Sequence, residues 1–165
     1  MIEPPLFGVA ANHPDVAAIT AALEAVVHRA PELTASDFAS EWAAALGRDS
    51  AGVASWTSSF TDRDWASAEA SRHEAWAGDA PVDFGALAQA SFPKVVVVGG
   101  WPETVAPGRA ATGRAYRAVG TAIARRIAGE LMVLPESSHN PQFEEPERLN
   151  ALLERVWTQA DEGRA

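Results

Sequence analysis

Two short runs of apolar residues in the second half of the chain constrain its fold more than any other feature. Val95–Val98 is an unbroken run of valine closed by Gly99 and Gly100, and Leu131–Leu134 is a second run stopped by Pro135. β-branched residues favour strands, and a continuous apolar run, unlike an alternating one, is typical of a strand buried on both faces. The sequence therefore predicts two buried strands.

The segments after these runs have the periodicity of helices. One helix is expected over roughly 107–128 and another from about Pro146 onward, because apolar residues recur there every three or four positions. These residues are Tyr116, Val119, Ile123 and Ile127, and then Leu149, Leu152, Leu153, Val156 and Trp157. Because strands and helices alternate, the two strands should be parallel and joined by a right-handed crossover.

The first half of the chain has a helical pattern instead, from about Pro14 to Ala90. Thr34 and Asp37 have the spacing of a capping box, and Gly47 stands where a glycine commonly ends a helix. The expected helices run from Pro14 to the residue before Pro31, from Thr34 to Gly47 and from Thr61 to Gly78, followed by a short turn around Phe84 and Leu87.

Composition narrows the classes of function. The chain has 13 basic and 22 acidic residues, a net charge of −9 and a pI near 4.8, so nucleic acid and anionic membrane surfaces are not expected partners. The absence of cysteine excludes disulfides, thiolate nucleophiles and cysteine-ligated zinc. No apolar run approaches the ~20 residues of a membrane span, and the N-terminus lacks the pattern of a signal peptide. We expect a soluble, cytoplasmic protein.

Two strands are too few for a stable sheet of this kind. Parallel strands that are apolar on both faces need neighbouring strands, and sheets usually have about 4–6 of them. Ile2 to Phe7 offers at most the end of a third strand. We therefore expect the back part of a larger α/β domain, whose incomplete sheet is completed by an N-terminal half from elsewhere or by self-association.

Three segments carry a resemblance to one family. LMVLPESSHNPQFEEPERLN (131–150) has an apolar strand, a turn, a histidine and an acidic-Pro segment that opens a helix. FPKVVVVGGWPE (92–103) is a strand that ends in glycine with an acid three residues later, and EPP (3–5) is similar to the residues between a core strand and a helical insertion. Together these segments resemble the C-terminal part of the α/β-hydrolase superfamily. The resemblance implies the end of a core strand at 1–12, a helical cap or lid at 13–91 and the C-terminal part of the core at 92–165.

The resemblance implies hydrolysis of an ester, or of a related carbonyl-activated or C–C bond, by a Ser-His-acid triad. His139 is then the general base and afterwards the general acid, and no metal or organic cofactor is needed. The family's nucleophile lies in a G-x-S-x-G elbow, which this sequence does not contain. The nearest string, 47–52, has Arg48 where a glycine must precede Ser50 by two positions. The serine is therefore expected from outside this chain.

Two carboxylates are candidates for the acid that orients His139. Glu103 lies three residues after Gly100, where the family usually has an aspartate, and Glu3 comes after the earlier strand, where some branches place the acid. Either carboxylate would fix the imidazole tautomer. Each residue also has a non-catalytic interpretation. Glu103 would then be a solvated loop residue, and His139 would be a surface histidine near the start of the last helix.

Aromatic residues supply the candidates for binding a small apolar or ester substrate. Trp101 lies just after a strand's carboxyl end, where ligands of open α/β sheets bind, and Trp42 and Trp65 belong to the helical half. Aromatic residues at helical spacing are also common as plain helix core. The alternative function is therefore a non-catalytic remnant or a binding and interaction module with an aromatic cap.

Overall fold

The computed structural model describes residues 1–162, apart from the side chains of Asp79 and Glu162. Its α-helices are α1 (Pro14–Arg29), α2 (Ala35–Ala45), α3 (Ser50–Thr57), α4 (Asp62–Ser71), α5 (Phe84–Gln89), α6 (Ala110–Arg126), α7 (Pro141–Glu144) and α8 (Pro146–Glu162). The strands are β1 (Val95–Gly99) and β2 (Glu130–Leu134), and the short 3-10 turns are η1 (Phe7–Ala10), η2 (Ala30–Glu32) and η3 (Ala77–Asp79). The chain is thus mixed α/β and mostly helical.

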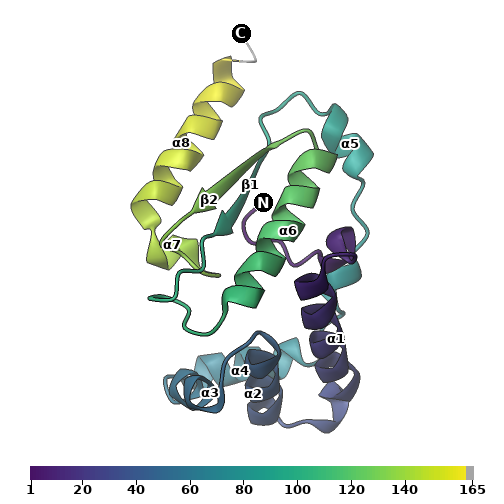
Figure 1. Ribbon diagram of the computed structural model, residues 1–165, viewed down its shortest axis with the longest axis vertical. Helices are drawn as coiled ribbons and strands as arrows, with labels where there is room; N and C mark the ends of the chain where they lie inside the picture. Colours follow the sequence, from purple (N-terminus) through teal and green to yellow (C-terminus); the bar gives the residue numbers. More distant parts are fainter. Residues whose placement is uncertain (163–165) are drawn as a thin grey trace.

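The two predicted strands are confirmed and form a parallel sheet. β1 pairs with β2 from Val95↔Glu130 to Gly99↔Leu134, and α6 provides the connection between them (Figure 1). The helix predicted over 107–128 is α6, and the one predicted from Pro146 is α8. Both are confirmed because the apolar periodicity and the flanking proline and glycine positions agree with the tertiary packing.

The N-terminus adds a short third member to this sheet. Ile2 bridges Val97 in parallel, the Val97 N–H donates to the Met1 carbonyl at 2.8 Å, and the Glu3 N–H donates to the Val97 carbonyl at 2.9 Å. The pairing stops there, because Glu3 leaves the extended conformation, with a φ of +43°, and the Gly99 N–H donates to the Glu3 side chain instead of its carbonyl. The sheet is therefore open, as expected from its few strands.

Helices cover both faces of the sheet. On one face Val96 and Val98 are fully buried against α6, where a Cβ at Gly120 would lie 2.6 Å from the Val98 side chain. On the other face, Val97 and Leu134 pack with two leucines of α8, Leu149 and Leu152. The short glycine contact allows α6 to approach the strands closely, which fixes the position of its N-terminal end.

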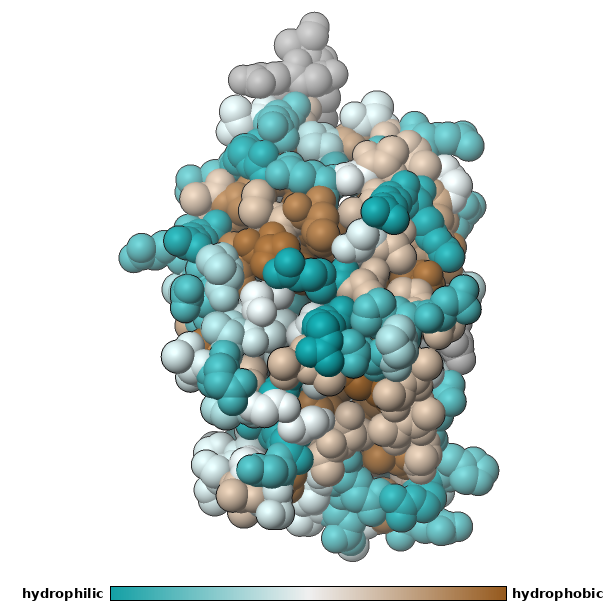
Figure 2. All heavy atoms as spheres, in the orientation of Figure 1, coloured by the Kyte–Doolittle hydropathy of each residue, from teal (hydrophilic) through white to brown (hydrophobic). Residues whose placement is uncertain are grey.

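β2 departs from the prediction of burial on both faces. Leu131, Met132 and Val133 are only half-buried, whereas β1 is buried from Val96 to Gly99. Within residues 1–162, β2 pairs only with β1 and lies at an edge of the sheet. Figure 2 shows hydrophobic atoms gathered between α8 and α6 on this face of the molecule.

Helices α2, α3 and α4, here called the helical lobe, lie apart from the sheet (Figure 1). Thr34 accepts a hydrogen bond from the Asp37 N–H, and Thr61 and Asp64 form a complete capping box. Gly47 has a φ of +84°, the left-handed conformation in which glycine ends a helix. The capping expected from the sequence is confirmed at these positions. Within residues 1–162, no helix is long and apolar enough to cross a membrane.

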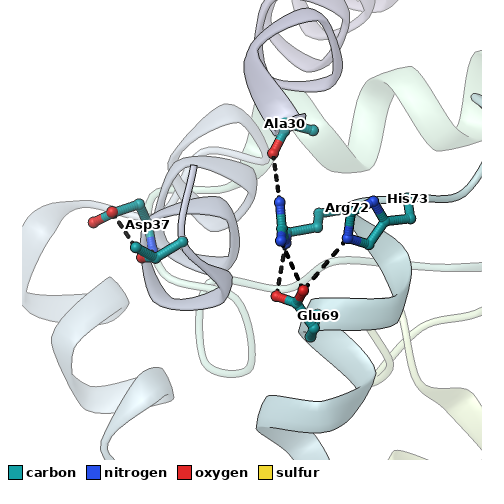
Figure 3. Close-up of polar contacts among 6 residues, drawn as sticks. Ala30, Asp37, Glu69, Arg72 and His73 are labelled. Atoms are coloured by element: carbon teal, nitrogen blue, oxygen red, sulfur yellow. Dashed lines mark hydrogen bonds and ion pairs between the residues drawn. The ribbon is translucent and has the colours of Figure 1, made fainter. Parts of the chain in front are cut away.

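Two details of the lobe differ from the prediction. Helix α3 was not expected, although Asp49 is its N-cap and accepts a hydrogen bond from the Gly52 N–H at 2.7 Å. Helix α4 ends at Ser71 and does not continue to Gly78, so Trp76 lies beyond it. Next to its end, Arg72 binds Glu69 and reaches the Ala30 carbonyl after α1, as Figure 3 shows.

Candidate functional site

The carboxyl ends of the strands bring Glu3 and His139 together. Glu3 ends the N-terminal segment that pairs with β1, and His139 lies in the loop after β2. Nδ1 of His139 lies 3.5 Å from Oε2 of Glu3. The Glu3 side chain is 2% exposed and that of His139 is 44% exposed, so the carboxylate is buried behind a ring that solvent can reach.

The backbone aims the Glu3 carboxylate at the histidine. Its Oε1 accepts a hydrogen bond from the Gly99 N–H, while its Oε2 has no hydrogen-bond partner among the described residues. Glu3 has a φ of +43°, a left-handed conformation that is strained for a residue with a side chain. Strain of this kind persists only where the surrounding structure imposes it, and it is frequent at functional sites.

Two glutamates hold the loop that carries His139. Ser137 Oγ donates to Glu145 at 2.9 Å, and the Glu136 N–H donates to the same oxygen at 2.8 Å. The N–H and hydroxyl of Ser138 donate to Glu144 at 2.6 and 2.7 Å. Both serine hydroxyls next to His139 are therefore engaged in fixing the loop.

Gly99 permits the close approach of this loop to β1. A Cβ at Gly99 would lie 2.2 Å from the Ser138 carbonyl and 2.6 Å from the Ser137 carbonyl. Both distances are far below van der Waals contact, and both contacts are with backbone atoms that cannot rotate away. The glycine that closes the valine run thus determines where His139 lies relative to Glu3.

Two aromatic rings surround the histidine. The ring centroid of Tyr116 lies 5.3 Å from that of His139, and Trp101 lies 6.5 Å away and stacks on Tyr116. Trp101 has a φ of +54° and covers Gly113, where a Cβ would meet it at 2.5 Å. Burial raises the pKa of the Tyr116 phenol well above its ordinary value, so this group stays neutral.

Arg109 continues this arrangement toward the helical lobe. Its guanidinium lies 4.6 Å from the Trp101 ring, and its Nε donates to the Leu46 carbonyl at 3.1 Å. Burial, with a smaller effect from the charge of Arg48, lowers the pKa of Arg109 to about 10. The group is still cationic at neutral pH.

The structure does not bring Glu103 to His139. Its carboxylate accepts a hydrogen bond from the Gly108 N–H at 2.9 Å within the exposed loop after β1. The Glu103 side chain thus closes its own loop instead of reaching the histidine. Of the two candidate acids, Glu3 is the one that contacts His139.

A cavity of about 500 Å³ lies between the helical lobe, η1 and α6. Its aromatic lining consists of Phe7, Phe38, Trp42, Trp56, Phe60, Trp76 and Tyr116. Trp42, one of the candidate binding residues, lines this cavity. Trp65 is not among the lining residues, because its ring packs on Phe60 at 4.7 Å, and Trp101 lies beside His139 instead.

Sequence reasoning missed two members of the site. Tyr116 was assigned to the apolar face of its helix, and its polar tip was the only signal that it differs from its neighbours Val119 and Ile123. Arg109 had no signal at all, since one arginine before a helix is common. Within residues 1–162, no group of three or more His, Cys, Asp or Glu side chains could hold a metal ion.

The arrangement is a histidine held by a buried carboxylate on one ring nitrogen, with its exposed edge beside aromatic rings. Such a pair can accept and return a proton. Comparison with family models, with curated proteins and with solved structures found no match to this chain.

Proposed function

We propose that this chain supplies the histidine and the acid of a Ser-His-Glu triad, in a protein of the α/β-hydrolase type. The reaction class is hydrolysis of an ester or a related carbonyl-activated or C–C bond. One observation carries the proposal, namely the buried Glu3 carboxylate 3.5 Å from Nδ1 of the half-exposed His139, where the strands end. The strand order and the helical segment between Glu3 and β1 are consistent with it.

Each residue then has a defined role. The Glu3 carboxylate favours the tautomer with a proton on Nδ1, which leaves the Nε2 lone pair to take a proton from a hydroxyl. The same carboxylate stabilises the imidazolium that forms. Tyr116 and Trp101 lie beside the ring, with their centroids 5.3 and 6.5 Å from its centroid.

The attacking serine has to come from another polypeptide segment, because the sequence has no G-x-S-x-G. Ser137 and Ser138 are poor substitutes, since their hydroxyls already donate to Glu145 and Glu144. The open sheet offers an edge beside Met1–Glu3 at which further strands can add. We propose that this edge receives the part of the domain that carries the nucleophile.

The assignment of Glu3 as the acid that orients His139 is tested by ¹⁵N NMR of the His139 ring, at a pH where the ring is neutral. The wild type should show mainly the Nδ1–H tautomer, and Glu3→Gln should lose this preference because an amide oxygen is a weaker acceptor. Glu103→Gln is the matched control and should leave the tautomer unchanged. An effect of Glu103→Gln with none from Glu3→Gln would contradict the assignment.

The reaction is tested with short p-nitrophenyl esters. The purified chain should show no turnover alone, and turnover should appear with a polypeptide, encoded beside this chain, that carries G-x-S-x-G after a strand. That activity should be lost in His139→Ala. Robust hydrolysis by the chain alone, lost in His139→Ala, would show that the nucleophile lies within it and would overturn the missing-serine proposal.

The aromatic cavity favours a second candidate, a binding module without catalysis. A volume of about 500 Å³ is within the range that holds small ligands, and its lining is mainly apolar. A stable homodimer that binds apolar ligands, with no adjacent G-x-S-x-G polypeptide, is the outcome this alternative predicts.

A further inference from the structure

Two arginines near the candidate site have no carboxylate partner among the described residues. Arg109 is 7% exposed and Arg48 is half-buried, and neither forms an ion pair with a described acid. Five other arginines do pair with acids, namely Arg29, Arg72, Arg114, Arg148 and Arg155. The chain has many more acids than bases, so the missing partner is not explained by a shortage of carboxylates. Glu144 and Glu3 act on the Arg109 charge only from beyond ion-pair distance. A buried charge without a direct counter-ion is costly, which points to an external anion.

Arg109 still has donors to offer. Its only guanidinium hydrogen bond among the described residues runs from Nε to the Leu46 carbonyl, and its two Nη nitrogens are not sealed from solvent. Its planar face lies on Trp101, whose ring also contacts His139. An anion bound to the Nη nitrogens would therefore lie next to the Trp101 ring.

The start of α6 favours an anion at the same place. This helix of 17 residues begins directly after Arg109, with no side-chain cap and no acidic residue in its first turn. Its free N–H groups and its dipole attract negative charge. The nearest acid of the loop, Glu103, binds the Gly108 N–H and forms no ion pair with Arg109. Helix and guanidinium thus provide two independent reasons for anion binding.

The neighbouring cavity indicates what the anion is attached to. Leu46, whose carbonyl binds Arg109, and Trp56, whose ring lies 5.5 Å from the Arg48 guanidinium, both line that cavity. The two arginines thus contact residues of its wall without lining it themselves. The lining is mainly apolar and aromatic, and its charged members are Asp64, Arg72 and Glu74. A ligand with an apolar ring in the cavity and a negative group at its end matches both features.

We propose that Arg109, assisted by Arg48, binds the carboxylate of a small aromatic acid whose ring occupies this cavity. The planar guanidinium is suited to a carboxylate, which it can bind through two parallel hydrogen bonds. The inference deepens the proposed function, because it gives the substrate a negatively charged end. Only the hydrolysis of an ester bond of that substrate at His139 rests on the proposed function. Binding itself requires no catalysis.

The test compares 3-phenylpropionate with its uncharged amide, by calorimetry and tryptophan fluorescence on the full chain. The wild type should bind the acid at least about tenfold more tightly than the amide, the size expected for hydrogen bonds to a charged group. Arg109→Gln should remove this preference. Arg117→Gln, an exposed position on the same helix, is the matched control and should retain it.

Other variants keep the result decisive. Should Arg109→Gln fail to fold by circular dichroism, Arg48→Gln decides the matter, because it should reduce the preference while leaving the Leu46 contact intact. Equal binding of acid and amide by the wild type would overturn the proposal, as would inorganic phosphate binding as tightly as the acid. His139→Ala should bind the acid normally, so failure of the triad and failure of this anion site are separate outcomes.

Discussion

The sheet region and the helical lobe are held together in different ways. Helix α6 buries eight residues against the strands and α1, whereas α3 and α4 bury none. The lobe depends on N-caps, on edge contacts between aromatic rings and on the Arg72 contacts with Glu69 and Ala30. Glu3 and His139 lie on the tightly packed region, and the cavity lies toward the lobe. The histidine and its carboxylate are therefore held by the more tightly packed of the two regions.

The largest expected effect on stability comes from a substitution that creates a cavity in the packed sheet region. Ile123 on α6 is 0% exposed, so Ile123→Ala should lower the free energy of unfolding by about 2–5 kcal/mol. Val53→Ala is the control in α3, where no residue is buried, and should cost less than about 1 kcal/mol. Urea denaturation measures both. Similar losses for the two variants would contradict the contrast between the regions.

Gly99→Ala should have the next largest effect. Its Cβ would overlap the backbone of Ser137 and Ser138, so the loop must shift, at a cost of about 1–3 kcal/mol. The shift should also separate His139 from Glu3, which ¹⁵N NMR of the ring detects as a loss of tautomer preference. Gly108→Ala is a useful comparison, because no atom lies within 4 Å of the added carbon, although its φ of +69° makes alanine strained there. It should leave the His139 signals unchanged.

The strands, the parallel pairing and most helices were predictable because local pattern and tertiary packing agree. Valine runs, capping boxes and glycine stops act over a few residues and need no knowledge of distant contacts. The contact between Glu3 and His139 was predictable only as one of two choices. Sequence spacing does not show that Glu103 turns back to Gly108, or that Gly99 admits the histidine loop.

The features that could not be predicted depend on contacts between distant segments. Arg109 joins the site because the Leu46 carbonyl, 63 positions away, accepts its hydrogen bond. Helix α4 is joined to the end of α1 because Arg72 reaches the Ala30 carbonyl, 42 positions away. β2 is less buried than its composition suggests because it lies at an edge. None of these contacts leaves a trace in local periodicity.

A smaller effect is expected from removing the Arg72 side chain, which joins α4 of the helical lobe to the end of α1. Arg72→Gln removes the contact with the Ala30 carbonyl and the two hydrogen bonds to Glu69. Hydrogen exchange of α4 amides should accelerate while that of β1 amides stays the same, because the change is confined to the lobe. Arg63→Gln, an exposed position in the same helix, should have no such effect. Faster exchange across the whole chain would show that the two regions unfold as one unit.

The smallest effect concerns the charge of Glu69. Its hydrogen bond with Arg72, assisted by His73, lowers the pKa of this carboxyl from an ordinary 4.5 to about 2. A lowered pKa in the folded state means that the ionised form favours folding, so this contribution is complete above pH 4.5. It is lost as the pH falls from about 4.5 through about 2. Glu69→Gln lacks the contribution at every pH.

The difference in Tm between the wild type and Glu69→Gln measures this contribution directly. The wild type should be slightly more stable at pH 7, and the difference should vanish as the pH is lowered toward 2. Because the pair is exposed at the surface, added salt should also reduce the difference. A difference that persists at about pH 2, or that ignores salt, would mean that Glu69 contributes through packing, and the lobe would then resemble the sheet region more closely than its exposed helices indicate.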